Sequence, residues 1–200
     1  MEKTIRELNG TVCIEMEEIS PAKKQILNSR SFDHSVNDYN SLAESITLYM
    51  SSAAVKLRKQ QSFAGSVHVF ITTSLHKPDE LYYSNSTTIS LPSPTADTRQ
   101  LVNIALWGLK QIYKPNYNYA KAGVMLGELV PAQEVQTDMF SHATLPKSAA
   151  LMTAMDSINR KMGKESIKLA SEGFKRPWKM KQDSKSPSYT SKWDEVLKVN

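Results

Sequence analysis

The stretch VHVFIT, residues 67–72, alternates apolar and polar side chains and is the clearest structural signal in this 200-residue chain. Successive side chains of a β-strand point to opposite faces, so the pattern predicts a strand with one face in a core. Val67, Val69 and Ile71 would form the core face. The stretch STTISL, residues 86–91, repeats the alternation after a polar connection and predicts a second strand. Prolines cannot donate to a strand ladder, so Pro92 and Pro94 would end it.

Two amphipathic helices are expected around this pair of strands. Ser41-Leu-Ala-Glu44 has the pattern of a capping box, and the helix that it opens would run to about Gln60. Asp97 is a candidate N-cap for the second helix. Apolar residues at helical spacing mark both. They are Leu42, Ile46, Tyr49, Met50, Ala53 and Leu57, then Leu101, Val102, Ala105, Leu106, Leu109 and Ile112.

Short β-compatible stretches at residues 26–32 and 121–127 complete the order β-α-β-β-α-β. This order predicts an α+β domain with a four-stranded antiparallel sheet and both helices on one face, the split βαβ arrangement. The other face would be open to close approach by a phosphate backbone. A face that is simply solvated is the alternative. The open face would carry Ser86, Thr88, Ser90, Lys121, Gly123 and Gly127.

Positive charge is concentrated near the C-terminus. The net charge is +5, and residues 141–200 hold 12 Lys and Arg against 6 Asp and Glu, whereas residues 1–140 hold 13 against 14. Such a tail either attracts an acidic partner or only keeps the segment solvated, and both remain open. Apolar residues from 151 to 158 predict a short helix ended by Gly163. Ile167 and Leu169 suggest a small strand, in an appendage that needs a partner to order fully.

Catalytic, metal and nucleotide sites are not expected. The four histidines do not pair with Cys13 at metal-ligand spacing, and no Gly-rich phosphate loop is present. A solvated charge run explains the acidic segment 15–18 better than a two-metal site does. The single cysteine excludes an internal disulfide. Because no apolar stretch approaches the roughly 18 residues of a membrane span and the N-terminus lacks a secretory core, we expect a cytoplasmic protein without a membrane partner.

Six strings occur in the order and spacing of one known family. They are RELNG (6–10), PAKKQILNSRSF (21–32), AAVKLR (53–58), PTADTRQL (94–101), YAKAGVMLGEL (119–129) and SPSYTSKWDE (186–195). Together they resemble the C-terminal half of the UmuC-type Y-family DNA polymerases, which include the catalytic subunit of DNA polymerase V and plasmid-borne relatives.

The resemblance implies a division of the chain. Residues 1–22 would be the end of a thumb and a linker, and 23–130 a little-finger DNA-binding domain. Residues 131–147 would be a linker with a clamp-binding motif, and 148–200 a C-terminal extension. The palm, with the carboxylates that hold Mg²⁺ in the intact polymerase, has no counterpart among these strings. The resemblance therefore implies no catalysis and no cofactor for this chain alone.

The resemblance also implies two sets of site residues. Ser29, Arg30 and Ser31 match the first little-finger strand, which faces template phosphates, and Lys121 and Gly123 match the last. With Ser86 and Thr88 of the open face they form the expected DNA-binding set. Residues 136–140, QTDMF, resemble the sliding-clamp pentapeptide, in which Gln136, Met139 and Phe140 would make the contacts. Alternatively, Met139 and Phe140 only pin the linker to the domain.

The expected function is to hold primer-template DNA and to tether an error-prone translesion polymerase to the beta sliding clamp during the SOS response. The resemblance implies a UmuD′ dimer and a recombinase (RecA) filament as further partners, and a nucleoid-associated location. The alternative is a non-catalytic, truncated product that competes with intact polymerase for clamp, UmuD′ or DNA.

Overall fold

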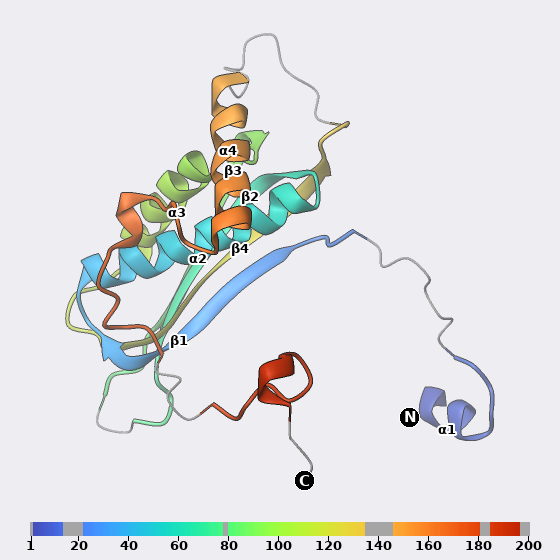
Figure 1. Ribbon diagram of the computed structural model, residues 1–200. Coiled ribbons are helices and arrows are strands. Elements are labelled where there is room, and N and C mark those ends of the chain that lie inside the picture. The colour runs from blue at the N-terminus through green and yellow to red at the C-terminus, as the bar shows by residue number, and fades with distance from the viewer. Residues whose placement is uncertain (1, 14–21, 78–79, 135–145, 181–184, 197–200) are drawn as a thin grey trace.

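The computed structural model describes residues 2–13, 22–77, 80–134, 146–180 and 185–196 (Figure 1). The predicted order of elements is confirmed between residues 26 and 131. It consists of β1 (Ile26–Val36), α2 (Tyr39–Lys59), β2 (Ser62–Thr73), β3 (Ser84–Thr95), α3 (Thr98–Ile112) and β4 (Tyr119–Pro131). A short helix α1 (Glu2–Leu8) precedes them, and it has no buried residue. The helix α4 (Pro146–Met162) and two 3-10 turns, Ala170–Glu172 and Trp193–Glu195, follow.

The four strands form one sheet in the order β1-β4-β2-β3, and each pair of neighbours is antiparallel. Consequently α2 joins two parallel strands, β1 and β2, with β4 between them, and α3 joins β3 and β4 with β2 between them. This is the predicted split βαβ arrangement. Both helices lie on the same side of the sheet, as Figure 1 shows.

The hydrophobic core lies between the sheet and these two helices. The strands contribute the side chains that alternation assigns to one face, and the helices contribute those at helical spacing. Leu106, which the pattern places in the core, is only partly buried. The fully buried core residues include Leu42, Ile46, Met50, Leu57, Val67, Val69, Ile71, Leu101, Leu109, Val124 and Leu126.

Two predicted boundaries are wrong. The N-cap of α2 is Asp38 rather than Ser41, because an Asp38 carboxylate oxygen accepts a hydrogen bond from the Ser41 backbone N–H at 2.6 Å. Pro92 and Pro94 do not end β3, which continues to Thr95. β3 is an edge strand whose register with β2 shifts after Ser90, so prolines there break no regular ladder. Asp97 is confirmed as the N-cap of α3.

The C-terminal extension is partly as predicted. α4 ends at Met162, and the next residue, Gly163, has the positive φ of +106° that ends a helix. The expected strand at Ile167 and Leu169 is wrong. The Asn159 side chain accepts from the Ile167 N–H and donates to the Ile167 carbonyl, both at 2.9 Å, so a side chain occupies the groups that a neighbouring strand would use. Among the residues described, no helix has both the length and the apolar character of a membrane span.

Candidate nucleic-acid interface

The open face of the sheet, on the side away from α2 and α3, is defined by the strand register. His68 on β2 lies opposite Met125 and Thr88, and Phe70 lies opposite Gly123 and Ser86. None of the paired register positions on this face is acidic, and the acidic strand residues Asp33 of β1 and Glu128 of β4 fall outside these pairs. The paired positions are Leu27, Ser29 and Ser31 on β1, Lys121, Gly123, Met125 and Gly127 on β4, Ser66, His68, Phe70 and Thr72 on β2, and Ser84, Ser86, Thr88 and Ser90 on β3.

This register brings most of the predicted DNA-binding residues to one surface. Ser29 pairs with Gly123 and Ser31 pairs with Lys121, so the first and last strands of the domain are neighbours. Ser86 and Thr88 belong to the same face, two strands away on β3. Their hydroxyl groups and the Lys121 ammonium are the kinds of donors that contact phosphate oxygens.

Arg30 does not belong to this face. It pairs with the buried Ala122, and its neighbour Asn28 donates a side-chain hydrogen bond to the Tyr49 carbonyl of α2 at 3.0 Å. Burial raises the pKa of Tyr49 to about 12, and the positive charge of Arg30 opposes part of that rise. Ser29, Arg30 and Ser31 therefore do not act as one surface, and a DNA contact of Arg30, which remains a prediction, would come from the helix side of the edge strand.

Gly123 does not expose its backbone on the open face as expected. A Cβ at this position would overlap the Phe70 ring and the Ser29 Cβ, with the Phe70 Cε1 at 2.7 Å. Gly123 is buried for this reason, because the ring reaches across β4 above it. Phe70 lies on the open face although it is not among the predicted site residues. The signal for this placement was its position in the alternation of residues 67–72, which assigns it to the face away from the core.

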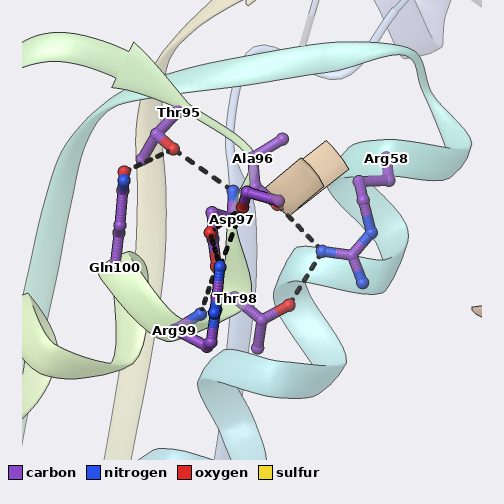
Figure 2. Close-up of polar contacts among 8 residues, drawn as sticks. Arg58, Thr95, Ala96, Asp97, Thr98, Arg99 and Gln100 are labelled. Atoms are coloured by element: carbon purple, nitrogen blue, oxygen red, sulfur yellow. Dashed lines mark hydrogen bonds and ion pairs between the residues drawn. The ribbon is translucent and has the colours of Figure 1, made fainter. Parts of the chain in front are cut away.

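A polar cluster lies at the junction of β3 and α3. Its residues include members of two of the sequence strings quoted above, AAVKLR and PTADTRQL. The Arg58 Nη1 donates to the Ala96 carbonyl at 2.9 Å and to the Thr98 hydroxyl at 2.8 Å (Figure 2). The buried Asp97 accepts from the Arg99 backbone N–H at 2.8 Å and from its guanidinium at 2.9 Å. Burial raises the pKa of Asp97, but hydrogen bonds from Arg99 and Ser148 outweigh this, so the pKa is lowered overall.

The same cluster holds the C-terminal extension. Arg58 makes a two-pronged ion pair with Asp156 of α4, through Nε at 2.6 Å and Nη2 at 2.8 Å. Ser148 donates to the Asp97 carboxylate and accepts from Arg99. The residues that match AAVKLR and PTADTRQL at this junction thus form a structural joint between α2, α3 and α4.

Trp178 is a further anchor of the extension. Its side chain is 3% exposed, and its ring meets the rings of Phe32 and Tyr49 edge to face with centroids 6.1 Å away from each. The indole N–H donates to the Glu44 carboxylate at 3.3 Å. Trp178 of the C-terminal extension therefore belongs to the core of the α+β domain, and the need of the extension for a partner stays a prediction.

Other predicted sites lie outside the described residues. These are the clamp-binding residues Gln136, Met139 and Phe140 and the acidic segment 15–18. Within the described part of the chain, no group of three or more His, Cys, Asp or Glu side chains is placed to hold a metal ion.

Known proteins resemble this chain along its whole length. The model of the impB/mucB/samB family C-terminal domain matches residues 23–139, and that of a domain of unknown function, DUF4113, matches residues 149–199. Protein UmuC of Salmonella typhimurium strain LT2 is 38% identical over 200 residues, which are 100% of this chain and 47% of the relative. Protein ImpB of Salmonella typhimurium is 36% identical over 197 residues, 98% of this chain and 46% of the relative.

Among solved structures, the complex of the beta-clamp processivity factor with the little finger domain of PolIV is similar, with a TM-score of 0.38 and 10% identity over 58% of this chain and 99% of that one. The chain spans about half the length of the curated relatives that it matches. It belongs to the impB/mucB/samB family, as the C-terminal, little-finger domain followed by the DUF4113 extension.

Proposed function

We propose that this chain is the DNA-holding and clamp-tethering portion of a translesion DNA polymerase that acts in SOS repair and mutagenesis. The observation that carries the proposal is the composition of the open face. Lys121 and a series of hydroxyl side chains lie there, and none of its register positions is acidic, although the chain contains 20 Asp and Glu. A surface whose paired positions carry hydroxyls and a cation suits a polyanion.

The expected mode of binding is contact with phosphates rather than with base edges. Hydroxyl groups and a lysine position a protein on a nucleic-acid backbone but do not distinguish one sequence from another. Primer-template DNA would therefore be held at any sequence, as a polymerase that copies damaged templates requires. The proposal assigns no catalytic role to this chain, and the Mg²⁺ chemistry would belong to a palm domain.

The proposed partners come from the resemblance of the chain to its family. Gln136, Met139 and Phe140 would bind the beta sliding clamp, and a UmuD′ dimer and a RecA filament would act on the same polymerase near the nucleoid. The beta clamp can be tested directly. A double Met139→Ala, Phe140→Ala variant should lose clamp binding in surface plasmon resonance, because short motifs concentrate their affinity in one or two apolar anchors. Binding equal to that of the parent would contradict this assignment.

The DNA-binding proposal is tested by the salt dependence of affinity. Fluorescence anisotropy with a labelled primer-template should give a log-log slope that falls by about 0.7 to 0.9 in magnitude when Lys121→Ala removes one phosphate contact. Lys110→Ala is the matched control, because Lys110 is an exposed lysine of α3, on the other side of the sheet. A DNA affinity that does not change with salt concentration, or that depends strongly on base sequence, would overturn the proposal. A smaller slope for Arg30→Ala would extend the interface to the helix side of β1.

A further inference from the structure

Phe70 occupies the centre of the open face. Its neighbours across the sheet are Gly123 on β4 and Ser86 on β3. The ring reaches over Gly123, where no larger residue fits without displacing it or Ser29. Phe70 remains half-buried rather than buried, so part of the ring is open to solvent. An aromatic ring is thus held against the sheet by a glycine on the adjacent strand.

The residues next to Phe70 make a small aromatic and apolar patch. His68, two residues earlier on β2, has its ring centroid 6.0 Å from that of Phe70, and its Nδ1 is 2.8 Å from the Thr88 hydroxyl, which holds the ring in place. Met125 lies opposite His68, and Leu27, 55% exposed, lies opposite Met125. Hydroxyl groups and Lys121 surround this patch on the same face.

The charges of the face indicate what kind of molecule fits an aromatic ring there. None of its register positions is a carboxylate, and Lys121 lies on the same strand as Gly123, two residues away, which suits a polyanion. A duplex presents phosphates, but its bases are already stacked and leave an aromatic ring without a partner. Unpaired bases stack on aromatic side chains, and a four-stranded sheet with exposed aromatic residues is a known platform for them.

We propose that Phe70 is a stacking site for an unpaired base of single-stranded DNA, with Lys121, Ser29 and Ser86 placed for the adjoining phosphates. The site accepts any base, because every base has a π-face. This inference rests on the proposed function and deepens it, since it assigns the open face to single-stranded template as well as to the DNA backbone.

The test compares two labelled strands of equal length with the full chain. One is a thymidine oligonucleotide, and the other has the same backbone with abasic sites. The parent should bind the base-containing strand roughly 5- to 100-fold more tightly, as expected for stacking on one ring. Phe70→Leu keeps an apolar cover over Gly123 but removes the π-face. It should abolish most of this preference and leave affinity for the abasic strand unchanged.

Two further variants separate stacking from other effects. Phe70→Tyr should keep the preference for bases, and Trp107→Ala should not change it, because Trp107 is a 56% exposed aromatic residue of α3 on the other side of the sheet. Thermal unfolding of each variant identifies losses that come from misfolding. If the parent binds both strands equally, the stacking site is wrong while phosphate binding stands. If neither strand nor a duplex binds, the proposed function itself fails.

Discussion

The two faces of the sheet differ in what their side chains do. On the helix face, alternate strand residues enter a continuous core that also includes Trp178 of the C-terminal extension. On the open face, the intervening residues are hydroxyls, glycines, one lysine, the rings of His68 and Phe70, and the apolar Leu27 and Met125. Because the same strands supply both faces, substitutions at adjacent residues should have different effects. A substitution on the helix face should change stability, and one on the open face should change binding. Ser29 and Arg30 show how sharply a pleated strand separates the two faces.

The largest expected effect on the helix face is that of Trp178→Ala. It removes an indole packed against Phe32 and Tyr49, and it leaves the Glu44 carboxylate without that donor. We expect the free energy of unfolding to fall by about 3 to 5 kcal/mol, measured by urea denaturation. Trp193→Ala is the matched control, because Trp193 is 93% exposed and should change stability by less than about 0.5 kcal/mol. Equal losses for the two variants would show that Trp178 is not part of the core.

A smaller and pH-dependent effect is expected at the β3–α3 junction. The pKa of Asp97 is lowered in the folded protein, so its stabilisation is complete above the ordinary aspartate pKa of about 3.9 and is lost as the pH falls through the lower folded value. Asp97→Asn should therefore lower the free energy of unfolding by about 2 kcal/mol at pH 7. Below about pH 4 the difference in unfolding free energy between the variant and the parent should narrow. Urea unfolding at pH 7, 5 and 3 measures this difference.

The exposed Asp194→Asn variant is the control for that series, since it should leave stability close to the parent value at pH 7. A cost for Asp97→Asn that stays constant as the pH falls would assign the effect to packing rather than to the charge of Asp97.

The smallest of these effects belongs to the open face. Gly123→Ala places a methyl group against the Phe70 ring and the Ser29 Cβ, and we expect a loss of about 1 kcal/mol, since the half-buried ring can move toward solvent but Ser29 cannot. Gly127→Ala meets one side-chain atom, the Ser66 hydroxyl oxygen at 2.8 Å, and should cost less. Thermal melts of both variants give the comparison. A greater loss of stability for Gly127→Ala than for Gly123→Ala would mean that the Phe70 ring does not pack against Gly123.

The fold could be predicted from the sequence because the spacing of apolar residues indicates the strands and helices. Alternation at residues 67–72 and helical spacing in the two helices each assign one face to a core, and together they give the order of elements. Arg30 was harder, because in Ser29-Arg30-Ser31 all three side chains are polar and no hydrophobic pattern fixes the pleat. The continuation of β3 through Pro92 and Pro94 was also hard to predict, because it depends on β3 being an irregular edge strand. Trp178 depends on a contact with Glu44 across 134 residues, which local pattern cannot reveal.

The burial of Trp178 affects how this family should be cut and recombined. Family models divide the chain between residues 139 and 149, but the hydrophobic core also includes Trp178, which lies past that border. A chimera that exchanges little fingers at the border would replace Phe32, Tyr49 and Glu44, the contact residues of Trp178, without replacing Trp178 itself. Exchanges made with residues 23–180 as one module would keep those contacts together.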